Sequence, residues 1–203
     1  MKTRELSIPH AFEFTPTVHR DARGSFTEWY QFEAVEDAVG HPLNLKQGNA
    51  SVSQEGVARG IHYALVPPSQ AKYVTVTHGA VLDYIVDIRV GSPTFGQWES
   101  VLLDDESHRA VYLAEGLGHA FVTLTDGATV SYLVSEVFNP TRELAINLQD
   151  PDVGLQFPVD MTELQLSPKD VDGASLADSL AAGSLPTWAD CLALYDSLNQ
   201  QNG

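Results

Sequence analysis

The alternation of apolar and polar residues predicts short β-strands over most of the chain. It is clearest at residues 72–78, after which Gly79 turns the chain into a second apolar run at 80–89. Further runs lie at 98–103, 110–113, 120–124 and 129–138, and 91–96 is a glycine-rich loop. Strands at this spacing, separated by glycine turns, are typical of a sandwich or barrel and not of βαβ units. We therefore predict an all-β body.

Helical patterns are confined to one short segment at 33–39 and to the C-terminal part. After Ser167 and Pro168 the pattern changes, and residues 175–182 and 186–199 predict two short helices, with Gly183 ending the first. No internal repeat or long linker divides the chain. We predict one domain over residues 1–203, with a β-barrel core at 1–158 and a helical tail at 159–203.

Composition narrows the possible partners. The 203 residues contain 11 Lys and Arg against 27 Asp and Glu, a net charge of −16, which argues against binding to DNA or RNA. No apolar run is long enough to cross a membrane, and the first residues lack the apolar core of a signal peptide. Cys191, the one cysteine, excludes an intrachain disulfide and a multi-cysteine zinc site. We expect a cytoplasmic protein with no nucleic-acid or membrane partner.

Positive charge is nevertheless concentrated in one part of the chain. Five of the 11 cations fall between residues 20 and 72: Arg20, Arg23, Lys46, Arg59 and Lys72. An acidic protein that gathers its cations in this way is expected to bind an anionic ligand at a defined place.

His62 lies within this segment and has two interpretations. An isolated histidine in a strand is most often a hydrogen-bonded core residue, but Arg59 and Lys72 nearby favour a binding or catalytic site. Strict alternation would place Arg59 and His62 on opposite faces of the strand. Both can reach one pocket only if Gly60 bulges the strand.

Four other polar residues are candidates for the same site. Lys72 shares a strand face with Val74 and Val76, so it needs a counter-charge that a ligand oxyanion could supply. The other three have ordinary structural interpretations. Tyr132 would be a core tyrosine on the strand face formed by Val130, Val134 and Phe138. His119 would be a polar residue at a barrel mouth, and Asp170 a helix N-cap.

Several familiar catalytic patterns are absent from the sequence. There is no His-x-His with a following Glu and a later His, so a metal-binding barrel is not expected. A Gly-x-Ser-x-Gly elbow and a phosphate-binding glycine loop are also absent.

Seven segments, in register along nearly the whole chain, resemble the dTDP-4-dehydrorhamnose 3,5-epimerase family. Each is weakly specific alone, and together they are strongly so: DARGSFTE (21–28), KQGNAS (46–51), GVARGIH (56–62), QAK (70–72), VDIRVGSPTFG (86–96), GLGHAF (116–121) and NPTRE (139–143). The similarity extends to residues 150–151 and 167–170, and is greatest to actinobacterial members, including ones that make unusual deoxysugars.

This resemblance implies a cupin or jelly-roll barrel that works as a homodimer, without metal or other cofactor, on a dTDP-4-keto-6-deoxyhexose. The C4 ketone acidifies the hydrogens on C3 and C5, so inversion needs a base, an acid on the opposite face and a cation near the enolate oxygen. By family precedent His62 is the base, held by Asp170, Tyr132 is the acid and Lys72 stabilises the oxyanion.

The resemblance also implies the binding residues. Arg59 and Arg23 would bind the diphosphate, and Glu28 would accept a hydrogen bond from the thymine. The segment 23–28, which includes Phe26, would come from the other subunit. Phe138 stands where the family usually has a tyrosine that stacks on thymine, and Gly48 replaces a more often polar residue. The rest of the pocket would be lined by Gln47, Asn49, His119, Glu143 and Lys169.

Three alternatives stay open at this point. Epimerases of this kind invert C3, C5 or both with the same base and acid, and differ in where the tyrosine ring sits; we place double inversion first. A related 3,4-ketoisomerase would have a second histidine two residues after His62, where this chain has Ala64. A barrel that only binds nucleotide sugars would not need an acid and a base on opposite faces.

Overall fold

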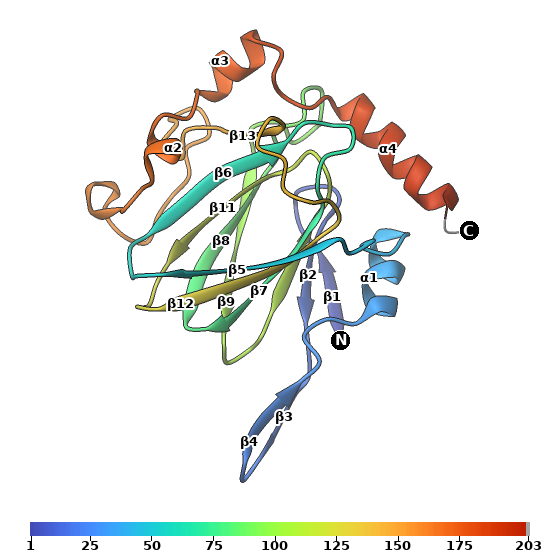
Figure 1. The fold of residues 1–203 in the computed structure, drawn as a ribbon, viewed down its shortest axis with the longest axis vertical. Helices are drawn as coiled ribbons and strands as arrows, with labels where there is room; N and C mark the ends of the chain where they lie inside the picture. The colour runs from blue at the N-terminus through green and yellow to red at the C-terminus, as the bar shows by residue number, and fades with distance from the viewer. Residues whose placement is uncertain (202–203) are drawn as a thin grey trace.

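The computed structural model describes residues 1–201 and consists mainly of two antiparallel β-sheets that face each other (Figure 1). The six-stranded sheet has the order β1 (Lys2–Glu5), β2 (Ala11–Thr15), β10 (Ala110–Leu113), β7 (Lys72–His78), β12 (Ala128–Val134), β5 (Gln47–Ser53). The five-stranded sheet has the order β13 (Glu143–Ala145), β6 (Ala58–Ala64), β11 (Gly118–Thr123), β8 (Ala80–Val86), β9 (Trp98–Asp104). The predicted all-β, barrel-like fold is confirmed.

Two predicted strands end earlier than the apolar pattern indicates. β8 stops at Val86 because the backbone of Asp87 bonds to Gln97 and Gly96, which closes a loop. β12 stops at Val134, where its pairing with β5 and β7 runs out. Phe138 therefore lies in a loop beyond the strand, and the expectation that it shares a strand face with Tyr132 was wrong.

The predicted helices are confirmed with small changes of boundary. They are α1 (Phe32–Val39), α3 (Leu176–Ala181) and α4 (Trp188–Gln201), with α3 capped by Ser175. The structure adds a 3₁₀ turn, η1 (Met161–Glu163), and a short helix, α2 (Pro168–Val171). Ser167 caps α2 by accepting a hydrogen bond from the amide of Asp170, so the N-cap interpretation of Asp170 was wrong.

Apolar side chains pack in two layers. One cluster fills the interior between the sheets and extends to α1 and α4. The other lies on the outer face of the five-stranded sheet, where the segment after β13 covers it with Ile146, Leu148, Val153, Leu155, Leu176 and Leu185. Because this segment covers the outer face, α2 is held directly beside β6 (Figure 1).

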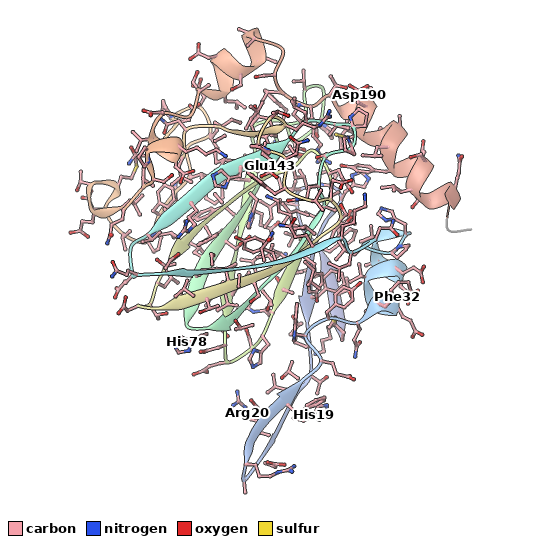
Figure 2. All side chains as sticks on the ribbon, in the orientation of Figure 1. His19, Arg20, Phe32, His78, Glu143 and Asp190 are labelled. Carbon is pink, nitrogen blue, oxygen red and sulfur yellow. The ribbon has the colours of Figure 1, made fainter. Side chains whose placement is uncertain are left out.

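A hairpin of β3 (Val18–Asp21) and β4 (Gly24–Thr27) projects away from the barrel (Figure 1). Figure 2 shows His19 and Arg20 on this hairpin, at the opposite end of the molecule from Glu143. The hairpin carries Phe26 with 65% of its surface exposed. Within the described residues no helix is long and apolar enough to cross a membrane.

Candidate active site

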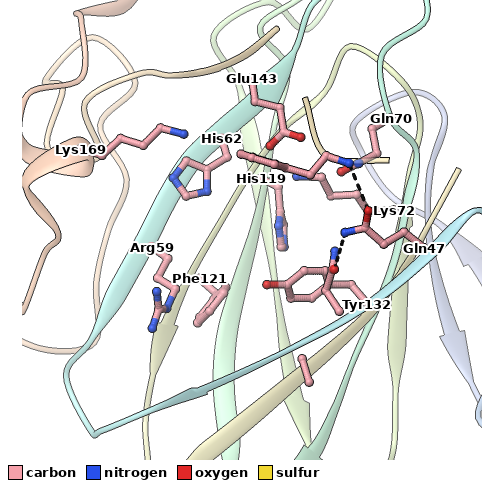
Figure 3. A pocket seen from close by; sticks show the side chains of 13 residues that line it. Gln47, Arg59, His62, Gln70, Lys72, His119, Phe121, Tyr132, Glu143 and Lys169 are labelled. Carbon is pink, nitrogen blue, oxygen red and sulfur yellow. Dashed lines mark hydrogen bonds between the residues drawn. The ribbon is translucent and has the colours of Figure 1, made fainter. Parts of the chain in front are cut away.

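A cavity of about 390 Å³ opens between the two sheets (Figure 3). Ten of the 13 residues that line it are among those expected from the sequence: Gln47, Asn49, Arg59, His62, Lys72, His119, Tyr132, Phe138, Glu143 and Lys169. The other three are Ala50, Gln70 and Phe121. Residues from six strands, two loops and α2 therefore meet at a single place.

The bulge expected at Gly60 is present in β6. His62 pairs with His119 and Arg59 pairs with Phe121, so three steps along β6 match two along β11. Gly60 has φ of +123°, and a side chain there would place Cβ 2.5 Å from Cβ of Ala120. Only glycine fits this position, and its extra residue turns Arg59 and His62 into the same cavity.

His62 is held by a buried carboxylate. Nε2 of His62 lies 2.6 Å from Oδ1 of Asp170, whose other oxygen accepts a hydrogen bond from the Ser167 hydroxyl at 2.7 Å. Burial opposes ionisation of Asp170, but the hydrogen bonds from His62 and Ser167 outweigh it and lower its pKa. With its Nε2 proton donated to this carboxylate, the imidazole keeps the lone pair on Nδ1 for a proton from a ligand.

Tyr132 faces His62 from the other side of the cavity (Figure 3). It belongs to β12 in the six-stranded sheet, whereas His62 belongs to β6 in the five-stranded sheet. Its hydroxyl makes no hydrogen bond to any residue in the described part of the chain. The two side chains thus line opposite walls of one cavity, and Tyr132 both packs against the interior apolar cluster and reaches the cavity.

Lys72, from β7, is half-buried as a residue, and its ammonium group is the buried part. Burial lowers the pKa of its ammonium group, Glu143 and Asp83 oppose this shift, and Lys169 adds to it. Across residues 1–201 the ammonium group forms no hydrogen bond or ion pair. A buried cation without such a partner suits an oxyanion supplied by a ligand.

A second histidine–carboxylate pair lies deeper in the cavity. Nε2 of His119 is 2.8 Å from Oδ2 of Asp83, and the Asp83 side chain is fully buried. Burial raises the pKa of Asp83, and His119 partly offsets the shift. Asp83 is not among the residues predicted from the sequence, although a carboxylate among the apolar residues of a predicted strand is a signal of such a role.

The mouth of the cavity is fixed by polar contacts. Arg59 donates to the Ser53 hydroxyl from Nε and Nη2, at 3.2 and 3.1 Å. Gln47 donates to Oδ1 of Asn49 at 2.7 Å and accepts from the amide of Phe138 at 3.2 Å. Three of the lining residues are cations and one is an acid, which favours an anionic ligand in this otherwise acidic protein.

Comparison with known proteins agrees with this geometry. Residues 5–178 match the model of the dTDP-4-dehydrorhamnose 3,5-epimerase family. The chain belongs to this family. The dTDP-4-dehydrorhamnose 3,5-epimerase of Mycolicibacterium smegmatis is 52% identical over 200 residues, covering 98% of each chain.

Two solved structures extend the similarity to the fold. The rmlC epimerase of Mycobacterium tuberculosis superimposes with a TM-score of 0.95 at 48% identity, over 98% of this chain and all of the other. ChmJ, a 3′-monoepimerase of Streptomyces bikiniensis crystallised with dTDP-quinovose, gives 0.93 at 44% identity, over 96% and 98%. This chain is therefore an epimerase, an isomerase with the expected cupin-like barrel.

Three expected binding residues of the epimerase do not line the cavity of their own chain. Arg23, with 90% of its side chain exposed, pairs with Asp21 at 2.6 Å on the projecting hairpin. Phe26 is exposed on the same hairpin, and Glu28, just after it, accepts from Gln31 at 2.9 Å.

No group of three or more His, Cys, Asp or Glu side chains that could hold a metal ion occurs among the residues that the structure describes.

Proposed function

We propose that this epimerase inverts both C3 and C5 of dTDP-4-dehydro-6-deoxy-D-glucose, a dTDP-4-keto-6-deoxyhexose, in deoxysugar biosynthesis. The family match and the relative at 52% identity, which is named as a 3,5-epimerase, support this substrate and this outcome. The observation that carries the proposal is the placement of His62 and Tyr132 on opposite sheets of one cavity, with the unpaired Lys72 lining the same cavity from β7, the strand next to that of Tyr132.

In this mechanism His62 removes a proton from the carbon next to the C4 ketone. The electron pair of the broken C–H bond moves to the carbonyl oxygen and forms an enolate, which the Lys72 ammonium stabilises. Tyr132 then donates its phenolic proton to the opposite face of the same carbon, and the C4 carbonyl re-forms. Asp170 keeps the His62 imidazole oriented and stabilises the positive charge that it gains.

The nucleotide would occupy the mouth of the cavity. Arg59, oriented by Ser53, and Lys169 on α2 would bind the diphosphate. The ring of Phe138, which is 55% exposed at the mouth, would stack on the thymine. The loss of the tyrosine hydroxyl at this position leaves the stacking face intact.

The test is NMR in heavy water with dTDP-4-dehydro-6-deoxy-D-glucose, recording which carbons take up deuterium and which configuration accumulates. We expect deuterium at both C3 and C5 and the doubly inverted product. His62→Ala should abolish uptake, and Tyr132→Phe should reduce inversion more than exchange, because exchange on the face of the base needs no second acid. Undiminished exchange in His62→Ala would remove His62 from its role, and a 3-keto product would identify a ketoisomerase.

We also propose that the epimerase is a homodimer in which the hairpin of one subunit completes the cavity of the other. Supporting this, Arg23, Phe26 and Glu28 lie on or beside an arm that leaves its own barrel (Figure 1). An exposed phenyl ring and guanidinium on such an arm are suited to contact a second copy.

Subunit mixing tests this arrangement. His62→Ala and Arg23→Ala homodimers should each be impaired, whereas in a mixed dimer one cavity would have both its own His62 and an intact partner arm. Re-equilibrated mixtures should therefore recover about a quarter of the wild-type activity from random pairing. No recovery, together with proof of subunit exchange, would show that Arg23 acts within its own chain.

A further inference from the structure

Phe121 is the one large, buried apolar side chain on the wall of a mostly polar cavity. It is 4% exposed, whereas Phe138, at the mouth, is 55% exposed. Phe121 lies two residues after His119 on β11, so both side chains point inward, with their rings 6.3 Å apart. No role for Phe121 follows from the proton transfers described above.

The position of Phe121 relates it to the proposed acid. Figure 3 shows its ring between Arg59 and Tyr132, with the phenol oxygen of Tyr132 directed toward it. Tyr132 packs against the interior apolar cluster to which Phe121 belongs. Because the Tyr132 hydroxyl has no hydrogen-bond partner in the described part of the chain, packing and not a polar contact determines where the phenol sits.

We infer that Phe121 is a positioning residue that limits how far the Tyr132 phenol can move between the two carbons flanking the ketone. This inference rests on the proposed function. A proton donor must approach to about 3 Å of the atom it protonates. If the side chain at 121 is smaller, the phenol can move further and protonate one of the two carbons more efficiently than the other. The size of this side chain therefore controls the share of product inverted at C3 and at C5.

Phe121→Leu removes the wall beside the phenol while keeping an apolar residue. We expect the ratio of inversion at C5 to inversion at C3 to change by about tenfold, since small displacements of catalytic groups have effects of this order or larger. Total deuterium exchange, which depends on His62, should change little. Phe14→Leu is the matched control, because Phe14 is fully buried in the same cluster but does not line the cavity. It should lose stability without changing the ratio.

A double-mutant cycle separates positioning from direct contact with the sugar. If Phe121 acts through Tyr132, Phe121→Leu should have no further effect on the residual inversion of Tyr132→Phe. An additive effect, or an unchanged ratio in the single variant, would overturn the inference. Phe121→Met, which also removes the ring and has nearly the volume of leucine, should change the ratio in the same direction and serves if the leucine variant folds poorly. Absence of exchange in the wild-type protein would instead refute the proposed function.

Discussion

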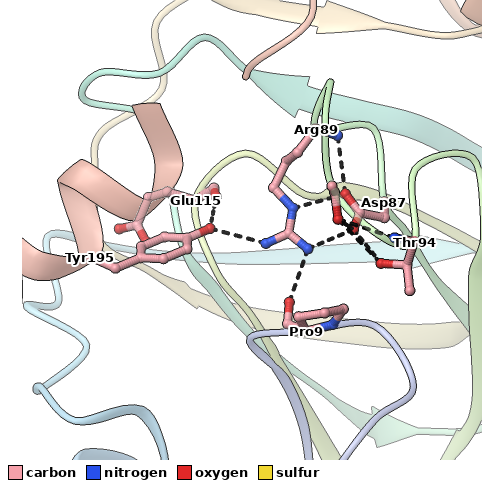
Figure 4. Close-up of polar contacts among 7 residues, drawn as sticks. Pro9, Asp87, Arg89, Thr94, Glu115 and Tyr195 are labelled. Atoms are coloured by element: carbon pink, nitrogen blue, oxygen red, sulfur yellow. Dashed lines mark hydrogen bonds and ion pairs between the residues drawn. The ribbon is translucent and has the colours of Figure 1, made fainter. Parts of the chain in front are cut away.

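Two regions of this epimerase bury positive charge, and they differ in whether the cation has a partner within the protein. Arg89, fully buried in the loop that follows β8, donates to both oxygens of Asp87 at 2.8 Å. It also donates to the carbonyl of Pro9 at 3.0 Å and to the Tyr195 hydroxyl at 3.4 Å (Figure 4). Its Cζ atom lies 4.5 Å from the centroid of the Trp188 ring of α4, so Arg89 ties the C-terminal helix to the barrel.

Lys72 is the opposite case. Its ammonium group lies beside the cavity with no hydrogen bond or ion pair inside the described chain, and burial lowers its pKa. A buried charge whose hydrogen bonds are all made stabilises a conformation, whereas one left unpaired costs stability and is available to a ligand. Pairing with a buried carboxylate thus separates the structural cation from the one expected to take part in catalysis.

The largest effect should follow from Arg89→Met. Removal of the guanidinium leaves the Asp87 carboxylate buried without its main partner, and breaking such a pair costs about 3–5 kcal/mol. Chemical denaturation should show this loss in the free energy of unfolding, while turnover per folded molecule stays close to wild type. Arg20→Met, at an exposed arginine of the hairpin, is the control and should change stability little. An unchanged unfolding midpoint in Arg89→Met would contradict the structural role.

Lys72→Met should give the reverse pattern. Loss of an oxyanion-stabilising group typically lowers kcat by 10²–10³, equivalent to about 2.7–4 kcal/mol. Stability should not fall, since methionine fills a similar volume without a charge that must be desolvated. Steady-state kinetics and denaturation of the same preparation check both statements. A loss of stability as large as that of Arg89→Met would remove the distinction between the two cations.

Thr94→Val probes the structural cluster more gently. The Thr94 hydroxyl donates to Oδ2 of Asp87 at 2.6 Å, alongside Ser92. Valine keeps the shape and deletes this hydrogen bond to a charged group, together with a longer one of 3.4 Å to the Ser92 hydroxyl, for an expected loss of about 1.5 kcal/mol in the free energy of unfolding. Thr77→Val, at an exposed threonine of β7, is the matched control. Equal effects of the two substitutions would mean that the Asp87 contacts add no stability beyond those of a surface hydroxyl.

The sequence predicted the parts of this picture that depend on local pattern. Alternation located β7 and β10 at their observed limits, and the cluster of cations predicted the site because Arg59 and Lys72 lie on strands close in sequence. Asp170, 108 residues from His62, could be assigned as its partner only from the family resemblance.

Asp83 and Phe121 were missed for a related reason. Their roles depend on which strands pair within the five-stranded sheet, and alternation within one strand does not determine this. The Asp87–Arg89 pair was read as the end of a strand, because its burial comes from Pro9 and Tyr195, which are distant in sequence.

The smallest expected effect is the change of kcat and of stability with pH that is due to Lys72, and it tests the comparison with Arg89 most closely. Because burial places its pKa below the ordinary value of 10.5, kcat should fall as pH rises through this lowered pKa and the ammonium is lost. Between the two values the unfolded chain binds more protons than the folded one, so the contribution of Lys72 to stability increases with pH.

As pH rises, kcat should therefore fall while the contribution of Lys72 to the free energy of unfolding increases. Lys72→Arg, whose guanidinium stays protonated, should move the alkaline fall of any remaining activity to higher pH. The stability difference between Lys72→Met and wild type should narrow over the same range, because the desolvated charge disappears from the wild-type protein. Parallel profiles for wild type and Lys72→Arg would assign the alkaline fall to another group, and Lys72 would then resemble Arg89 in being a structural cation.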